Sequence, residues 1–219
     1  MVQDDSLRQY SILDAVLERI NTIFRIDVKA ANIASLEEYP GIGEIKSWES
    51  QSERLNVVAL MRINHAGEVS AQGLYLGQAL FSRNHDIFKF LVAAASEERR
   101  HLVWCSRRIQ ELGGSISIFT PAWFIGSFFI GVTVSISGDP RNLGFVEETE
   151  KQVSQHLSGH LGRIPPDDKD TLLVLRQMRQ EEIKHGMQAE SLGGVEPPEL
   201  VKKLMSLAAL AMKEVAHKI

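Results

Sequence analysis

The sequence predicts an all-α protein built around a four-helix bundle. No segment sustains the alternation of apolar and polar residues that marks a strand, whereas several long segments carry apolar residues three and four positions apart. Clusters of turn-forming residues separate these segments. A chain of 219 residues has the length of one domain of ordinary size.

The helices follow one another in a simple order. An N-terminal helix is expected from Ser6 to Arg25, followed by a linker that contains Pro40. The four bundle helices are expected at residues 55–81, 85–112, 139–162 and 168–191, and a last helix at 198–217. The turns between them are Ser82-Arg83-Asn84, Pro165-Pro166-Asp167-Asp168, and the stretch with Gly193, Gly194, Pro197 and Pro198. We therefore expect an N-terminal helix and linker over residues 1–50 and the bundle over 51–219, in a single domain overall.

The connection between the two helix pairs is long and apolar. From Leu112 to Gly138 there are 27 consecutive residues without a charge (138 − 112 + 1). Pro121 and five glycines argue against a straight helix exposed to lipid. Two interpretations stay open, a buried crossover and an aromatic-rich segment that contacts a membrane. A bundle with one crossover requires a connection of this length.

Composition excludes several function classes. A formal net charge of -4 gives no indication of a polyanionic partner, so we expect no nucleic-acid binding. The single cysteine, Cys105, cannot form an internal disulfide or a Cys-x-x-Cys site, which indicates a reducing compartment. The N-terminus, with Asp4 and Asp5, lacks the pattern of a secretory signal and is typical of a mature cytoplasmic start.

Two Glu-x-x-His motifs, Glu98 to His101 and Glu182 to His185, place a carboxylate and an imidazole on one helix face. A single motif of this kind is more often a solvated surface pair. Here both motifs continue the inward stripe of their helices. The stripes run through Ile87, Leu91, Ala94, Glu98, His101 and Cys105, and through Leu175, Met178, Glu182, His185 and Ala189. Buried carboxylates need a partner, and a metal ion would satisfy several at once.

A lone glutamate is level with each motif. Glu68 lies 30 positions before Glu98 (98 − 68), and Glu150 lies 32 before Glu182 (182 − 150). The midpoints, 83 and 166, fall in the two predicted turns, so each antiparallel hairpin brings one glutamate beside one Glu-x-x-His. The stripe selects Glu150 over its neighbours at 147 and 148. A third motif, at residues 214–217, has no such partner and is expected to be a surface pair.

Two hairpins that each give a glutamate and a Glu-x-x-His supply the ligands of a two-metal site in a bundle. Carboxylates with two imidazoles suit iron or manganese. We expect a ferritin-like four-helix bundle with one long apolar crossover and additional N- and C-terminal helices, binding two iron ions per chain and using dioxygen as cosubstrate. The spacing leaves open which glutamates bridge. The predicted metal ligands are Glu68, Glu98, His101, Glu150, Glu182 and His185.

The stretch Asn64-His65-Ala66-Gly67-Glu68, with Gln72, Tyr75, Gly77 and Gln78, resembles the demethoxyubiquinone hydroxylase family of ubiquinone biosynthesis. The resemblance covers about residues 55–215 and includes both Glu-x-x-His motifs, Pro121, Trp123 and Glu150. Residues 1–50 do not match the shorter members. Leu157 stands where animal members carry a tyrosine, and His156, which falls on their histidine, is expected either near the ligands or exposed.

The resemblance implies an oxygen-dependent di-iron monooxygenase that hydroxylates a polyprenylated demethoxyubiquinol, with the same six residues as iron ligands. It also implies a protein peripheral to the cytoplasmic face of the inner membrane, on which the uncharged 112–138 segment would rest. Partners compatible with this function are a quinone-presenting accessory protein or other enzymes of the pathway. The alternatives are a soluble ferroxidase or iron-storage bundle, which leaves the apolar segment unexplained, and a metal-free interaction bundle, which the cost of burying unpaired charge disfavours.

Overall fold

The computed structural model describes residues 18–22, 39–43, 48 and 50–219, and this part of the chain forms helices and no strand. The all-α prediction is confirmed for these residues. The N-terminal helix expected at residues 6–25 lies mostly outside the described residues, although 18–22 are helical. The other helices are α2 (Gln51–Leu80), α3 (His85–Glu111), α4 (Thr120–Ile136), α5 (Asp139–Leu161), α6 (Lys169–Ser191) and α7 (Glu199–Lys218).

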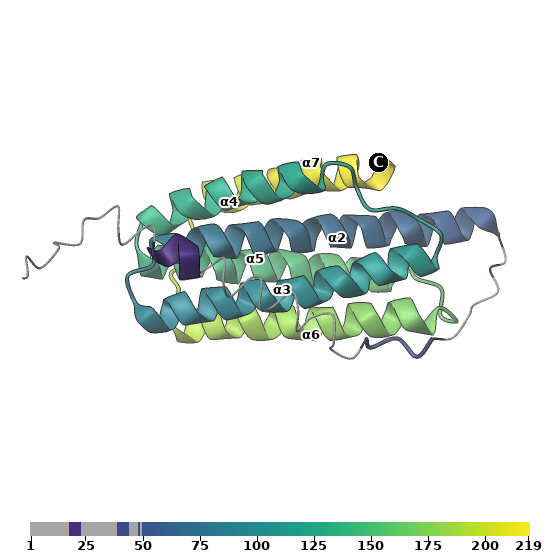
Figure 1. The fold of residues 1–219 in the computed structure, drawn as a ribbon, viewed down its shortest axis with the longest axis horizontal. Helices are drawn as coiled ribbons and strands as arrows, with labels where there is room; N and C mark the ends of the chain where they lie inside the picture. Colours follow the sequence, from purple (N-terminus) through teal and green to yellow (C-terminus); the bar gives the residue numbers. More distant parts are fainter. Residues whose placement is uncertain (1–17, 23–38, 44–47, 49) are drawn as a thin grey trace, which may run out of the picture.

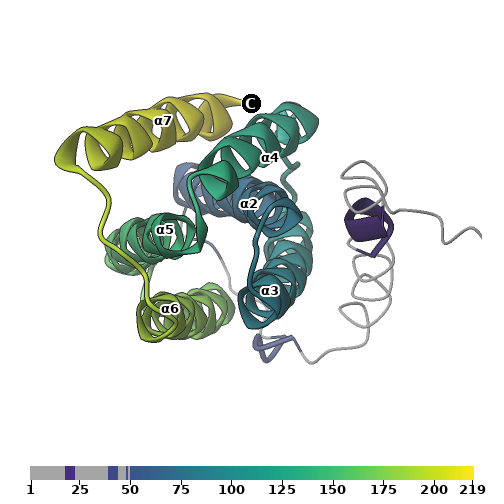
Figure 2. The same ribbon diagram turned by 90° about the vertical axis from the view of Figure 1, so that its left-hand side faces the viewer.

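Four of these helices form the predicted bundle. Seen end-on in Figure 2, α2, α3, α5 and α6 occupy its four corners, and α4 and α7 lie as a further layer over α2 and α5. All six helices run close to the long axis of the molecule (Figure 1). The hairpin α2–α3 and the hairpin α5–α6 are therefore joined by the crossover that contains α4.

Most helix ends agree with the predicted ones to within a residue, because turn and cap residues fix them. The exception is the start of α2, which begins four residues earlier than predicted. There the Ser50 side chain caps the helix by accepting a hydrogen bond from the Glu53 backbone N–H at 3.1 Å. At the other end, the Arg19 guanidinium donates to the carbonyl of Leu80 at 3.1 Å and covers the C-terminus of α2.

The crossover contains a helix with one exposed side, so of the two interpretations left open, that of a buried crossover is wrong. α4 packs against α2 through glycines: a Cβ on Gly131 would lie 2.1 Å from the Leu74 carbonyl oxygen, and one on Gly77 would lie 2.2 Å from that of Phe128. Pro121 stands in the first turn of α4, where a proline costs no hydrogen bond. The proline and glycines are therefore compatible with a helix that packs against the bundle.

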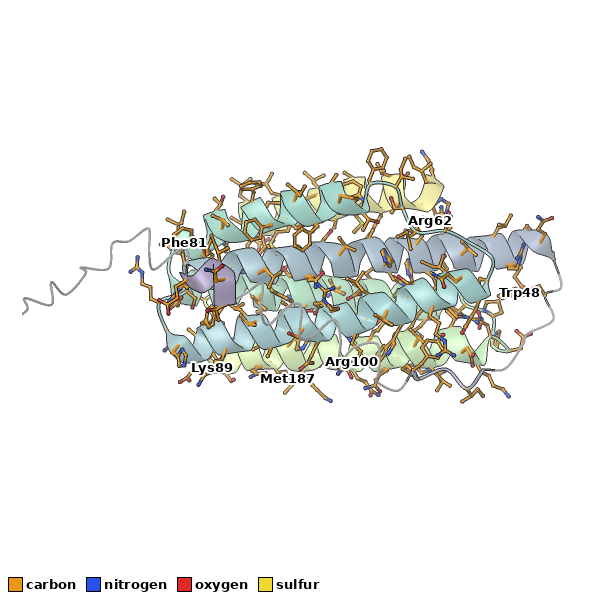
Figure 3. The ribbon with its side chains drawn as sticks, viewed as in Figure 1. Trp48, Arg62, Phe81, Lys89, Arg100 and Met187 are labelled. Atoms are coloured by element: carbon orange, nitrogen blue, oxygen red, sulfur yellow. The ribbon has the colours of Figure 1, made fainter. Side chains whose placement is uncertain are left out.

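The outer side of α4 and α7 is apolar. Side chains project from it away from the bundle (Figure 3). We call this surface the apolar face; its exposed members are Ile125, Phe129, Ile130 and Ile136 on α4 and Leu200, Leu204, Leu207 and Leu210 on α7. Among the described residues, each helix falls short of the length or apolar character needed to cross a bilayer.

The core of the bundle has two apolar clusters. One contains Tyr75, Leu91 and Val146 near the α2–α3 turn, and the other contains Leu60, Ile109 and Leu175 toward the opposite end. On each of the four bundle helices, the predicted ligands lie between the residues of the two clusters. The polar layer formed by Glu68, Glu98, His101, Glu150, Glu182 and His185 thus crosses the middle of the core.

Candidate metal centre

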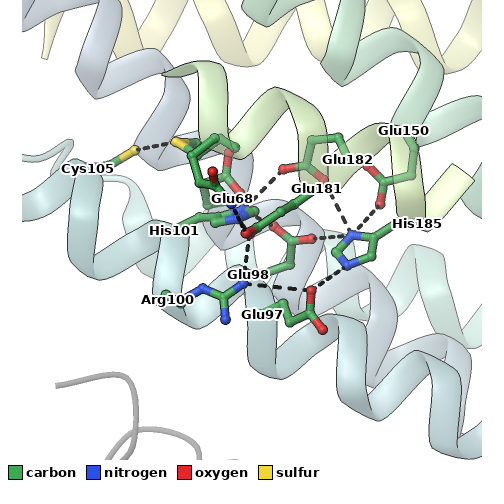
Figure 4. Close-up of polar contacts among 12 residues, drawn as sticks. Glu68, Glu97, Glu98, Arg100, His101, Cys105, Glu150, Glu181, Glu182 and His185 are labelled. Carbon is green, nitrogen blue, oxygen red and sulfur yellow. Dashed lines mark hydrogen bonds and ion pairs between the residues drawn. The ribbon is translucent and has the colours of Figure 1, made fainter. Parts of the chain in front are cut away.

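The six predicted ligands lie together in the bundle interior. Each is at most 4% exposed, and Figure 4 shows their side chains turned toward one another. The α2–α3 hairpin contributes Glu68, Glu98 and His101, and the α5–α6 hairpin contributes the other three. The helices place them at one level because residues equidistant from a hairpin turn are opposite each other.

The ligand atoms fall into two overlapping groups, each with its atoms within 4.8 Å of one another. Glu98 and Glu182 belong to both groups. The first group adds Glu68 and His101, and the second adds Glu150 and His185. The arrangement therefore offers two adjacent cation positions with two carboxylates in common.

Burial of so many ionisable groups perturbs their protonation. Burial first, and then the neighbouring carboxylate of Glu98, raise the pKa of Glu68 well above its ordinary value. Burial and the closeness of Glu182 do the same to the pKa of Glu150. For His101, burial lowers the pKa, but hydrogen bonds with the surrounding glutamates outweigh it and raise that pKa strongly. Without a metal, the raised pKa values of Glu68, Glu150 and His101 therefore favour the protonated forms of these three side chains.

The polar layer also lacks hydrogen-bond donors. Both carboxylate oxygens of Glu98 are buried and have no hydrogen-bond partner in the described part of the chain, although they lie 3.3 and 3.5 Å from the Nδ1 atoms of His101 and His185. One oxygen each of Glu150 and Glu182 is in the same situation. Buried acceptors without donors are costly. Cations between them would replace the missing partners, so this donor set fits a pair of metal ions bound by oxygen and nitrogen.

Glu148 and Glu214 lie outside the polar layer, as predicted, whereas His156 matches neither of its two expected positions. Glu148 is buried away from the layer and accepts a hydrogen bond from Gln152 at 2.7 Å. In the third motif, Glu214 is exposed, in agreement with a surface pair. His156 is neither exposed nor in the layer: it is half-buried, with its ring edge-on to that of His160 at 3.9 Å between centroids.

Three charged residues around the layer were not predicted from the sequence. Glu181 accepts a hydrogen bond from His101, Glu97 contacts His185, and Arg100 lies between the two glutamates (Figure 4). The signal was present in the sequence, because a second glutamate precedes the ligand glutamate in both motifs. Helical spacing places these residues beside the inward stripe and not on it, so the spacing did not select them.

A groove opens on the other side of the α2–α3 pair, where the N-terminal part of α4 covers it. Its volume is about 710 Å³, within the range of small-molecule sites, ~300–1,000 Å³. His65 and Gln72, one turn before and one turn after Glu68 on α2, line it together with Leu102, which follows His101. Ile125 belongs both to this lining and to the apolar face.

Comparison with known proteins identifies the family. Residues 56–216 match the sequence model of the family described as "Ubiquinone biosynthesis protein COQ7". The chain belongs to this family. The resemblance drawn from the motif at residues 64–68 is thereby confirmed, and the family match includes all six residues of the polar layer.

Relatives in the family carry the name of one activity. A 3-demethoxyubiquinol 3-hydroxylase of Coxiella burnetii (strain RSA 331 / Henzerling II) is 41% identical over 214 residues, which is 96% of this chain and 97% of that protein. The 3-demethoxyubiquinol 3-hydroxylase of Chromobacterium violaceum is 45% identical over 170 residues, covering 78% and 82% of the two chains. That of Cupriavidus pinatubonensis is 47% identical over 169 residues, covering 77% and 82%. The family's activity is thus a hydroxylation in ubiquinone biosynthesis.

Proposed function

We propose that this chain is a 3-demethoxyubiquinol 3-hydroxylase, a di-iron monooxygenase that hydroxylates the ring of a polyprenylated demethoxyubiquinol. The observation that carries the proposal is the convergence of four buried carboxylates and two imidazoles in two groups that share Glu98 and Glu182. The names of the family relatives support the substrate and the reaction.

In this proposal each residue of the polar layer has a role at the metal centre. Glu98 and Glu182 would be shared by the two irons, Glu68 and His101 would complete the ligands of one, and Glu150 and His185 those of the other. Ferrous iron bound there would supply the redox chemistry that activates dioxygen. In the overall reaction one oxygen atom is inserted into a ring C–H bond to give a hydroxyl group, and the other leaves as water, with two electrons and two protons from an external reductant.

The groove is the proposed binding site of the quinol. The apolar part of its lining, which includes Val69, Leu102 and Phe124, suits the ring and the first part of the tail, and its position beside Glu68 brings the ring toward the centre. Burial lowers the pKa of His65 to about 4, so this imidazole is neutral at pH 7. Its Nδ1 atom is buried without a hydrogen-bond partner among the described residues and is available to a ring hydroxyl.

The apolar face is the proposed contact with the membrane that supplies the quinol. Scattered apolar residues are normal on a surface, but four exposed large apolar side chains on each of two helices in the same layer favour an interaction site. Since Ile125 joins this face to the groove, a tail could pass from the bilayer toward the centre without crossing water. We propose a peripheral position at the cytoplasmic face of the inner membrane, where quinone-presenting or other biosynthetic proteins can contact the chain.

The metal centre is tested by anaerobic reconstitution with ferrous iron and measurement of bound iron. We expect two ions per chain in the natural protein and one or none in Glu182→Ala, because this glutamate belongs to both groups. Glu190→Ala, an exposed change on the same helix, is the control and should retain both ions. Equal iron content in all three proteins would refute the proposed site.

The reaction is tested with a short-tailed demethoxyubiquinol, a chemical reductant and ¹⁸O₂. A hydroxylase incorporates one labelled oxygen into the quinol. A ferroxidase or iron-storage bundle, the alternative that also explains the ligands, consumes dioxygen and ferrous iron but leaves the quinol unchanged. Dioxygen consumption with an unmodified quinol would therefore favour the alternative.

The membrane contact is tested by sedimentation with vesicles that contain anionic lipid. Leu207→Gln and Phe129→Gln each remove an exposed apolar side chain from the apolar face and should reduce the bound fraction. Met187→Gln removes one from α6, on the other side of the bundle, and should leave binding unchanged. If all three variants bind like the natural protein, the apolar face is not the contact.

A further inference from the structure

Each Glu-x-x-His motif is preceded by a second glutamate. Glu97 stands directly before Glu98 on α3, and Glu181 stands directly before Glu182 on α6. Both belong to the surroundings of the polar layer, but neither is among the six side chains that converge in it. Their contacts indicate a role different from that of the six predicted ligands.

Glu181 reaches across the bundle to the histidine of the opposite hairpin. Its Oε2 atom accepts a hydrogen bond from the Nε2 atom of His101 at 2.7 Å. Two further donors hold the same carboxylate, Arg100 at 2.7 Å and Gln177 at 2.6 Å. The Glu181 side chain is 10% exposed, so the interaction is largely shielded from water.

Glu97 repeats this contact in the other direction. Its Oε2 atom lies 3.0 Å from the Nε2 atom of His185 on α6. It has weaker support, because Arg100 is 3.8 Å away, and its side chain is 42% exposed. The two hairpins therefore exchange equivalent carboxylate–histidine contacts, of which one is buried and well supported and the other is open to solvent (Figure 4).

These contacts determine which ring nitrogen faces the polar layer. In both histidines the Nε2 atom points outward to the extra glutamate. The Nδ1 atom of His101 lies 3.1 Å from Glu182 and 3.3 Å from Glu98, and that of His185 lies 3.5 Å from Glu98. A neutral imidazole carries one N–H, and a carboxylate that accepts it at Nε2 leaves the Nδ1 lone pair free for a metal.

We propose that Glu181 and Glu97 are positioning residues of the proposed metal centre, each fixing the imidazole of the opposite hairpin with Nδ1 toward the metal, and that the site with His101 binds its ion more tightly. We expect tighter binding at the His101 site because Glu181 accepts hydrogen bonds from more donors than Glu97 and is less exposed to solvent. This inference rests on the proposed di-iron function and assigns roles to residues outside its ligand set. Carboxylates that orient metal-bound histidines typically affect metal affinity ~10–100-fold.

The test measures metal binding and needs no turnover. Cobalt(II), added anaerobically, is followed by its visible absorption and by calorimetry in the natural protein and in Glu181→Leu, Glu181→Gln and Glu97→Leu. We expect two ions in the natural protein and a ~10–100-fold weaker affinity of one step in Glu181→Leu. Glu181→Gln retains an acceptor oxygen and should recover most of the loss. Glu97→Leu should weaken the other step by less, and the exposed control Glu190→Leu should change neither.

A second measurement identifies the histidine ring nitrogen that binds the metal. In the zinc-loaded protein, which is diamagnetic, ¹H–¹⁵N spectra of labelled histidine distinguish ligation through Nδ1 from ligation through Nε2. We expect Nδ1 for His101 and His185 in the natural protein. This measurement and the Glu181→Gln titration remain decisive if Glu181→Leu fails to fold.

The outcomes separate this inference from the proposed function. If the natural protein binds no cobalt, the proposed metal centre itself fails, and the inference fails with it. If the natural protein binds two ions while Glu181→Leu and Glu97→Leu match Glu190→Leu within twofold, the centre stands and the inference is wrong. Ligation through Nε2, or a larger loss in Glu97→Leu than in Glu181→Leu, would also overturn it.

Discussion

The ion pair between Arg108 and Asp168 gives a sharp test of how the two ligand-bearing helices are held together. Arg108 lies two turns beyond His101 on α3, and its Nη2 atom is 2.7 Å from the Asp168 carboxylate, which also caps α6. The side chains are 6% and 1% exposed. Arg108 also donates to the Thr171 hydroxyl at 2.7 Å. Arg108→Leu should therefore leave the buried Asp168 carboxylate without its cationic partner.

The expected loss of stability in Arg108→Leu follows from the length of the ion pair and from its burial. At 2.7 Å the Coulomb energy is about 6 kcal/mol for an effective dielectric constant of ~20, of which desolvation of the two charges cancels a large part. Removal of one partner from a buried pair costs ~3–5 kcal/mol. Since each kcal/mol shifts the melting temperature of a domain of this size by ~2–4 °C, we expect Tm to fall by about 6–20 °C.

The neighbouring residue supplies the control. Arg107 forms an ion pair of almost equal length, 2.8 Å, with Glu111, but its side chain is 53% exposed. Arg107→Leu should cost at most ~1 kcal/mol. Urea unfolding followed by circular dichroism measures both variants on one scale. Equal losses in the two variants would show that burial does not set the strength of this pair, and the reasoning would be refuted.

Three further changes test other parts of the structure. Gly131→Leu should destabilise the protein by ~1–3 kcal/mol or more in urea unfolding, because a Cβ there meets the Leu74 carbonyl oxygen at 2.1 Å, whereas Gly126→Ala, with nothing within 4 Å, should be neutral or stabilising. Burial, followed by the charge of Arg163, lowers the pKa of His160 to about 4, so its neutral form stabilises the fold above about pH 6.5 and this stability is lost in acid. His160 should contribute ~2 kcal/mol of the loss at pH 5, so the acid loss should be smaller by about this amount in His160→Gln, in which His65 still contributes its own part; the same acid loss in both proteins would contradict the prediction. The pKa of His101 is raised by its glutamate contacts, and its burial opposes this, so the metal-free protein should lose stability as pH rises above about 6.5. Metal binding should release protons and reduce this loss, as calorimetry in buffers of different ionisation enthalpy and thermal unfolding with and without metal can measure.

The level of the ligands could be predicted because helices have a constant rise. Glu68 meets Glu98 for an arithmetic reason: equal numbers of residues on each side of a hairpin turn give equal heights. The contact of Glu181 with His101 could not be obtained in this way. It joins helices of different hairpins, and it depends on how α3 and α6 are rotated about their axes, which packing of the whole core decides.

The helix in the crossover could not be predicted from the sequence. Pro121 and the glycines lower helix propensity, and they argued only against a straight helix exposed to lipid. Gly131 acts through tertiary contact, since its missing side chain lets α4 approach the backbone of α2 at Leu74. Packing of one helix on another overrides the local preference. By contrast, the early start of α2 was readable, because Ser50 and Glu53 have the spacing of a capping box.

The position of the polar layer between two apolar clusters explains how the bundle tolerates it. Four carboxylates brought together in the interior oppose folding, and the metal-free layer offsets this only by binding protons. The cluster around Tyr75 and Leu91 and the cluster around Leu60 and Ile109 pack the helices on both sides of the layer. Because their packing fixes the helices, the ligands are held at short distances before any ion binds. A single cluster at one end would leave the other end free to splay and relieve the repulsion. The two-sided core therefore holds an unfavourable collection of charges in the arrangement that the proposed metal centre requires.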